Sequence, residues 1–136
     1  MIRIAIVEDE QLFREKILRY LHRYEEKNKQ SFSIKTFENG MQFLTDYRPE
    51  YDIIFMDIEM PYLSGMETAK RIRKVDSRTA IAFITNMANY AVQGYEVEAI
   101  DFIVKPFTYE VFEYKLGRIL SRTEDKREKS SIIVKS

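Results

Sequence analysis

The sequence predicts an α/β fold in which a parallel sheet of five strands is covered by helices on both faces. Short apolar segments alternate along the chain with segments whose apolar residues recur at helical spacing. The apolar segments are hydrophobic on both faces, which is typical of a buried parallel sheet. The length of 136 residues is that of one ordinary domain with a sizeable core.

Five short apolar segments are the predicted strands. The clearest is DIIFMD, which has four consecutive apolar residues and then a carboxylate. The others are shorter or mix in polar residues, but each is bounded by a helical pattern or by turn residues. The five predicted strands span residues 2–7, 32–37, 52–57, 79–85 and 100–105.

Five segments with helical periodicity follow the strands in turn. The second stops before Pro49, and the fourth is weak because Gly94 interrupts it. Strands that alternate with helices, joined by right-handed crossovers, leave few topologies. The simplest is the flavodoxin-like doubly wound sheet, a (βα)5 arrangement with strand order 2-1-3-4-5. The predicted helices span residues 11–28, 40–48, 65–75, 89–99 and 109–128.

The composition excludes several classes of function. The chain has no cysteine, which rules out disulfides, thiolate catalysis and zinc bound by cysteine. Basic and acidic residues balance at 22 each, so we expect any contact with DNA to lie outside this chain. No apolar run approaches the ~20 residues of a membrane span. The opening MIRIAIVEDE has acids where a signal peptide would stay apolar. We therefore expect a cytoplasmic protein without a membrane contact.

Acidic residues end two of the predicted strands. Glu8 and Asp9 follow the first strand, and Asp57 ends the third. Ligands of an open parallel sheet bind beyond the carboxyl ends of its strands, so these three carboxylates are expected to share one crevice. Their mutual repulsion is relieved by a cation, and oxygen ligands of this kind suit Mg²⁺. The alternative is that Asp9 or Glu10 only caps the first helix, but a cap does not account for Asp57.

Two further strand ends carry groups that bind anions. The fourth strand ends in Thr85, and the fifth ends in Lys105, which Pro106 follows. Either residue alone is more simply explained as an ordinary strand threonine or a surface lysine. Together with the acids they end four strands of one sheet, and a lysine there reaches an anion over the crevice.

These motifs resemble the receiver domain of two-component response regulators. The resemblance rests on IVEDE, IIFMDIEMPYLSGME, AIAFIT and IDFIVKPF, and it covers about residues 2–122. The stretch YAVQGYEVEAIDFIVKPF is similar to receivers of the LytTR group, whose output is a β-rich DNA-binding domain. The ending SSIIVKS resembles the first strand of that output domain. We therefore expect a receiver domain over 1–122, and a charged linker with the start of a truncated LytTR domain over 123–136.

The resemblance assigns roles to the strand-end residues. It implies that Asp57 accepts a phosphoryl group from a phosphohistidine of a sensor histidine kinase. It further implies that Glu8, Asp9 and Asp57, with the backbone carbonyl of Glu59, hold Mg²⁺. Lys105 would offset charge on the phosphoryl group. The domain would thus be a signalling switch that catalyses its own phosphorylation and slow dephosphorylation, and not an enzyme with turnover.

The resemblance also implies a way in which phosphorylation is transmitted. Thr85 would bind a phosphoryl oxygen and move inward, and Phe102 matches the aromatic residue that then turns toward the vacated space. Phe102 is equally well a plain core residue. The face built by 89–99, 100–105 and 109–128 would then pair two receivers as a homodimer. Control of transcription, and all contact with DNA, would pass through the LytTR output domain that this chain lacks.

Two other classes of function fit these residues less well. A Mg²⁺-dependent phosphatase of the haloacid dehalogenase type would carry a second aspartate two residues after the nucleophile, where this chain has Glu59. An interaction module without phosphorylation would have no need of the full set of strand-end residues.

His22 is the only histidine, and among charged neighbours on the first helix it is better explained as a solvated residue than as a phosphoryl carrier. The family further suggests a cis peptide between Lys105 and Pro106.

Overall fold

The sheet has the predicted topology. The computed structural model describes residues 1–86 and 93–135, with side chains up to residue 124. All five strands are parallel and lie in the order β2-β1-β3-β4-β5, which confirms the doubly wound sheet. The strands are β1 (Ile2–Val7), β2 (Phe32–Phe37), β3 (Ile53–Asp57), β4 (Ala80–Thr85) and β5 (Asp101–Val104).

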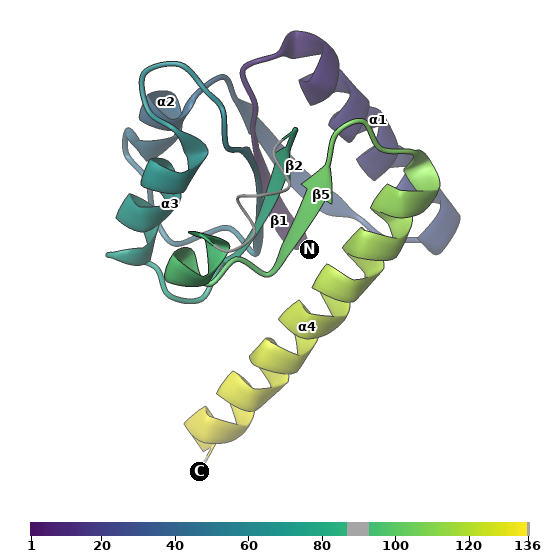
Figure 1. Cartoon of the computed structure of the whole chain (residues 1–136). Helices are drawn as coiled ribbons and strands as arrows, with labels where there is room; N and C mark the ends of the chain where they lie inside the picture. The colour runs from purple at the N-terminus through teal and green to yellow at the C-terminus, as the bar shows by residue number, and fades with distance from the viewer. Residues whose placement is uncertain (87–92, 136) are drawn as a thin grey trace.

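Helices cover both faces of the sheet. Figure 1 shows α1 and α4 on one side and α2 and α3 on the other. A short 3-10 helix, η2, packs against α3. None of the helices in the described ranges combines the length and the hydropathy that crossing a membrane requires. The helices are α1 (Gln11–Asn28), α2 (Gly40–Leu44), α3 (Gly65–Arg73), η2 (Gln93–Val97) and α4 (Tyr109–Lys135).

Three helices are shorter than expected, although α3, predicted over 65–75, ends only two residues early at Arg73. The helix predicted over 40–48 ends at Leu44, because Thr45 is extended and Asp46 adopts a left-handed backbone with a φ of 60°. Of the helix predicted over 89–99, residues 89–92 lie outside the described residues. The rest forms only the five residues of η2, consistent with the weak periodicity around Gly94.

The end of the chain differs most from the prediction. The helix predicted over 109–128 is present, but α4 continues to Lys135, through the part of 123–136 where the ending SSIIVKS was expected to begin a strand. The stretch after Gly117 contains no glycine or proline that would end the helix, and its charged residues are good helix formers. The β-branched residues of 132–134 suggested a strand, but three such residues lower helix propensity only slightly.

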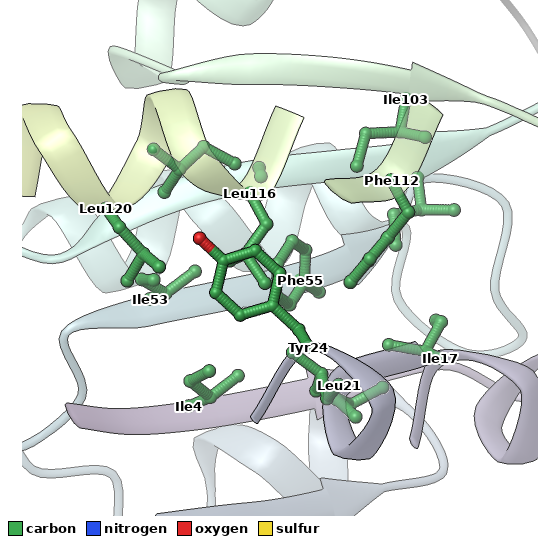
Figure 2. Close-up of a cluster of buried hydrophobic side chains, with 14 of the residues drawn as sticks. Ile4, Ile17, Leu21, Tyr24, Ile53, Phe55, Ile103, Phe112, Leu116 and Leu120 are labelled. Carbon is green, nitrogen blue, oxygen red and sulfur yellow. The ribbon is translucent and has the colours of Figure 1, made fainter. Parts of the chain in front are cut away.

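Alternate residues of the central strands build two separate cores. Ile53 and Phe55 of β3 point toward α1 and α4, where Leu21 and Phe112 pack against them (Figure 2). Ile54 points to the opposite face and belongs to the cluster under α2 and α3. Full burial of each such side chain stabilises the fold by about 1.5–3 kcal/mol, so both layers fix the sheet that carries the strand ends.

Candidate functional site

The carboxyl ends of the strands bring the predicted site residues together. Glu8 directly follows β1, Asp57 is the last residue of β3, and Lys105 directly follows β5. The side chains of Glu8 and Lys105 are each 1% exposed and that of Asp57 is 5% exposed, whereas Asp9 is exposed. Charged side chains are rarely this deeply buried without partners, so the partners of each group define the site.

Lys105 is the central cation of the cluster. Its Nζ lies 2.7 Å from Oε1 of Glu8, 3.2 Å from Oδ2 of Asp57 and 3.7 Å from Oε1 of Glu10. Its backbone N–H donates to the carbonyl of Thr85 at 2.8 Å, which ties the lysine to the end of β4. The peptide between Lys105 and Pro106 is cis, as the family resemblance suggested.

The site raises the pKa of both Glu8 and Lys105, but for different reasons. Burial, with a contribution from the nearby charge of Asp57, raises the pKa of the Glu8 carboxyl to about 8, although Lys105 acts in the opposite direction. Burial by itself lowers the pKa of the Lys105 ammonium, but Glu8 and Asp57 raise it above its ordinary value. Lys105 therefore stays charged at neutral pH, and one cation faces two buried acids.

Three acids are placed to hold a metal ion together. Carboxylate oxygens of Glu8, Asp9 and Asp57 all lie within 4.8 Å of one another. Oε1 of Glu8 is buried and has no aligned hydrogen-bond donor among the described residues, despite its close ion pair with Lys105. An all-oxygen set of clustered carboxylates fits Mg²⁺, which takes one or two carboxylates and keeps several waters.

The loop between β1 and α1 is held by its own hydrogen bonds. Glu10 is the N-cap residue of α1, but its side chain makes no capping hydrogen bond, so the capping alternative is wrong for this residue. Instead, Oε2 of Glu8 accepts from the backbone N–H of Glu10 at 3.1 Å. Nη1 of Arg14 donates to the carbonyls of Glu8 at 2.8 Å and Asp9 at 3.3 Å. Arg14 thereby fixes the backbone of the acidic pair.

The start of α3 approaches the backbone of Asp57 closely. A Cβ atom on Gly65 would lie 2.0 Å from the carbonyl oxygen of Asp57, so only glycine fits there. The N–H of Gly65 donates to the carbonyl of Ile58 at 2.8 Å, and Oγ of Ser64 caps α3 by accepting from Glu67 N at 3.1 Å. This role of Gly65 cannot be predicted from the sequence, in which it is one of four scattered glycines.

Glu59, the next predicted site residue, lies at the mouth of the crevice. Its backbone N–H donates to Oδ1 of Asp57 at 3.3 Å. Glu59 is exposed and, with Asp9, lines a cavity of about 740 Å³ beside the β3–α3 loop. The predicted use of its backbone carbonyl as a metal ligand stays a prediction.

The two predicted switch residues lie on β4 and β5. Thr85 is fully buried and follows Ile84, the residue that pairs with Asp57 across the sheet. Phe102 is half-buried, and its ring centroid lies 5.4 Å from that of Phe83. Their positions are compatible with the expected roles, which stay predictions.

Two residues near Lys105 were not expected at the site. Glu10 contributes the third carboxylate around the ammonium. The ring of Phe13 lies under the same ammonium, with its centroid 4.1 Å from Nζ. In the sequence Phe13 is one of several apolar residues at helical spacing, and that spacing does not distinguish a core residue from one that faces a buried cation.

The fold and the acidic cluster define a signalling domain of the receiver class, and comparison with known families gives the same result. A family model described as the response regulator receiver domain matches residues 4–116. The chain therefore belongs to the receiver domain family of two-component response regulators. Members of this family are signalling proteins and not classical enzymes.

Among curated proteins the chain is LytT-like. It is 37% identical over 130 residues to the sensory transduction protein LytT of Oceanobacillus iheyensis, covering 93% of this chain and 51% of that protein. The LytT protein of Bacillus subtilis is 32% identical over 118 residues, covering 87% and 48%. The transcriptional regulatory protein BtsR of Escherichia coli is 30% identical over 132 residues, covering 97% and 52%. The chain thus spans about half the length of the curated relatives it matches.

Solved structures of response regulators have the same fold as this chain. The response regulatory domain of mrkE from Klebsiella pneumoniae superposes with a TM-score of 0.77 at 28% identity, covering 91% of this chain and 99% of that one. The response regulator TrrA of Thermotoga maritima, solved in complex with Mg²⁺ and BeF, has a TM-score of 0.70 at 32% identity. That match covers 88% of this chain and 99% of the other.

Proposed function

We propose that this chain is a phospho-accepting receiver, in which Mg²⁺-dependent transfer from a sensor histidine kinase places a phosphoryl group on Asp57. The observation that carries the proposal is the buried group of Glu8, Asp57 and Lys105, with Asp9 at its edge. This cluster contains a nucleophile in Asp57, a cation for the phosphoryl oxygens in Lys105, and carboxylates that could bind a metal ion. The relative TrrA supports it, because that protein was solved with Mg²⁺ and a beryllium fluoride.

The transfer is a displacement at phosphorus. A carboxylate oxygen of Asp57 forms a bond to the phosphorus while the bond from phosphorus to the kinase imidazole nitrogen breaks, and that imidazole takes up a proton. Lys105 places positive charge beside the transferred oxygens, and the hydroxyl of Thr85 donates to one of them. Because β3 is buried along its whole length, Asp57 is held in a fixed position for in-line attack.

The acidic pair would hold the metal. Glu8, Asp9 and Asp57, with the backbone carbonyl of Glu59, are the proposed ligands of Mg²⁺. When bound, Mg²⁺ supplies positive charge that offsets charge on the phosphoryl oxygens and on the clustered carboxylates. The chain's own part is to present three carboxylates at the end of a rigid sheet and to keep Lys105 close to them.

Phosphorylation would be read at the face built by η2, β5 and α4. The added charge at Asp57 draws Thr85 inward, and Phe102 turns into the space released. Exposed apolar side chains of Val104, Val111 and Tyr114 on this face favour pairing of two phosphorylated receivers. Sedimentation of the chain with and without Mg²⁺ and beryllofluoride tests this, and a monomer in both states well above cellular concentrations would contradict it.

The partners and the biological output extend the same proposal. The partner upstream would be a sensor histidine kinase, as for receivers in general. The output would be control of transcription through a LytTR DNA-binding domain, as the resemblance to the LytTR group implies. The matched BtsR protein is a transcriptional regulatory protein, and this chain spans about half the length of the LytT and BtsR proteins. The phosphoryl group would leave slowly by hydrolysis, which resets the switch.

Intact mass spectrometry tests the central claim. The chain is incubated with acetyl phosphate and Mg²⁺, and Asp57→Asn and a sample with EDTA are treated in parallel. We expect one added phosphoryl group in the parent chain and none in the other two. An adduct that persists in Asp57→Asn would place the chemistry on another residue. No adduct in the parent, with no spectral change on titration with beryllofluoride and Mg²⁺, would favour an interaction module instead.

A further inference from the structure

Phe13 is an apolar residue of α1 whose ring contacts the buried ammonium of Lys105. It stands in the first turn of α1, four residues after Asp9. Its ring centroid is 4.1 Å from Nζ of Lys105, which is the distance of a close cation–π contact. The ring also contacts that of Phe107 at 6.4 Å between centroids. Phe13 therefore touches both the tip of Lys105 and the chain segment that follows the lysine.

The ring completes the surroundings of the ammonium. An ammonium has three N–H donors, and the carboxylates of Glu8, Asp57 and Glu10 lie 2.7, 3.2 and 3.7 Å from the Lys105 nitrogen. The lysine side chain is only 1% exposed, so water does not surround the charge. The face of the Phe13 ring lies against the same ammonium and adds favourable electrostatics from the side of α1.

Phe13 also has a second cation nearby. Nζ of Lys16 lies 5.6 Å from the Phe13 centroid, but it lies closer, at 4.9 Å, to the ring of Phe107. Lys16 is half-buried, whereas Lys105 is nearly inaccessible to solvent. Because cation–π attraction strengthens when the cation is desolvated, the contact with Lys105 is the stronger of the two.

We propose that Phe13 is a positioning residue for Lys105, and that the negative face of its ring holds the ammonium in the crevice and thereby sets the rate of phosphoryl transfer to Asp57. This inference rests on the proposed function. Phe13 touches neither the phosphoryl group nor Asp57 in the proposed reaction, so it acts only through the lysine. An apolar side chain of similar size fills the space but does not attract the ammonium.

Graded fluorination of Phe13 separates the electrostatics of the ring from its packing. Mono-, di- and trifluorinated phenylalanine are incorporated at position 13, since each fluorine withdraws charge from the ring face with little change in shape. The rate of phosphorylation by acetyl phosphate with Mg²⁺ is measured for each chain and for Phe13→Leu. We expect the rate to fall stepwise with fluorine number, reaching on the order of three- to tenfold for the trifluorinated chain and for Phe13→Leu.

The same series at Phe43 is the matched control. Phe43 is buried in the core on the opposite face of the sheet, and no cation lies over its ring within the part of the chain that the structure describes. Fluorination there should leave the phosphorylation rate unchanged. A graded fall at Phe43 equal to that at Phe13 would overturn the inference, because the effect would then come from general packing.

Two further outcomes decide the proposal. A flat fluorine series at Phe13 would show that the ring only packs, and would overturn it even if Phe13→Leu is slow. A parent chain that gains no phosphoryl group would overturn the proposed function and the claim about rate together. The contact itself is tested without any phosphorylation, because the ring current of Phe13 should shift the NMR resonances of the Lys105 side chain upfield, and Phe13→Leu should abolish that shift.

Discussion

The ammonium nitrogen of Lys105 lies 2.7 Å from Oε1 of Glu8, closer than the 3.2 Å that separate it from Oδ2 of Asp57. The lysine that is proposed to bind the phosphoryl group therefore pairs most closely with Glu8, the first acid of the pair that is proposed to hold Mg²⁺. One buried cation faces two buried acids, and the site lacks one positive charge. A proton on Glu8 or a divalent cation supplies it, and the two compete.

The first prediction concerns stability and pH without divalent cations. The folded chain raises the pKa of Glu8 from 4.5 to about 8, so the folded state holds this proton more tightly than the unfolded state does. The tighter binding of the Glu8 proton therefore contributes to the free energy of unfolding. This contribution is complete below pH 4.5 and is lost as the pH rises toward about 8. Urea unfolding in EDTA across this window should show falling stability for the parent chain. Glu8→Gln should flatten that fall, and equal slopes for both chains would contradict the prediction.

The second prediction concerns the crowding of acids. Asp57→Asn removes one of the two buried acids that share a single cation, so without Mg²⁺ Glu8 no longer has to take up a proton beside a second carboxylate. The free energy of unfolding should therefore rise by about 1–2 kcal/mol. Mg²⁺ at a hundredfold excess over its Kd should stabilise the parent by about 2.7 kcal/mol, and should stabilise Asp57→Asn much less.

Thermal unfolding of both chains with Mg²⁺ and with EDTA measures these two effects. Glu26→Gln is the control, because it removes an exposed carboxylate of α1 far along the helix from the acidic pair. It should change neither the stability in EDTA nor the gain from Mg²⁺. An Asp57→Asn chain that is less stable than the parent, or that gains as much from Mg²⁺, would argue against repulsion in the cluster.

The sequence was sufficient to predict which strand ends converge. Parallel strands end at one edge, so the apolar run before Asp57 and the one before Glu8 place their acids together whatever the details of packing. The sequence could not show that Lys105 prefers Glu8, or that Phe13 lies under the lysine. Both depend on the path of the long Lys105 side chain across the crevice. That path is set by the residues it meets at the ends of β1 and β3 and at the start of α1. The prediction of a strand from residue 130 was wrong for another reason. The β-branched residues there lower helix propensity only slightly, and no glycine or proline ends the helix before them.

The third prediction tests the close approach of α3 to the site. In Gly65→Ala the new Cβ would lie 2.0 Å from the carbonyl oxygen of Asp57 and 2.9 Å from Cα of Ile58, and both are backbone atoms that cannot rotate away. We expect the free energy of unfolding to fall by about 1–3 kcal/mol or more, as for other overpacked sites. We also expect slower phosphorylation, because the strand end that carries Asp57 must shift. A stability within about 0.5 kcal/mol of the parent in urea unfolding would contradict the contact.

The last prediction concerns the space beneath η2. The backbone of Gly94 is not left-handed, so this position needs glycine for room and not for conformation. A Cβ atom there would lie 2.5 Å from Cζ and 2.6 Å from Cε2 of Phe102, whose ring occupies the gap. Gly94→Ala should therefore destabilise the chain by about 1–3 kcal/mol. Gly117→Ala is the control, because its Cβ would meet only the Tyr24 hydroxyl at 3.8 Å, and as a helical substitution it should stabilise by about 0.5–1 kcal/mol.

A double-mutant cycle decides whether the Phe102 ring is the cause. Phe102→Ala removes the ring, so Gly94→Ala should add little further destabilisation in that background. Urea unfolding of the four chains should therefore give an interaction energy of at least about 1 kcal/mol. If Phe102 turns when Asp57 is phosphorylated, beryllofluoride with Mg²⁺ should change this coupling, because the ring would leave its place beside Gly94. Additive effects in the resting state would mean that the Phe102 ring does not occupy this space, and coupling unchanged by beryllofluoride would count against Phe102 as the switch.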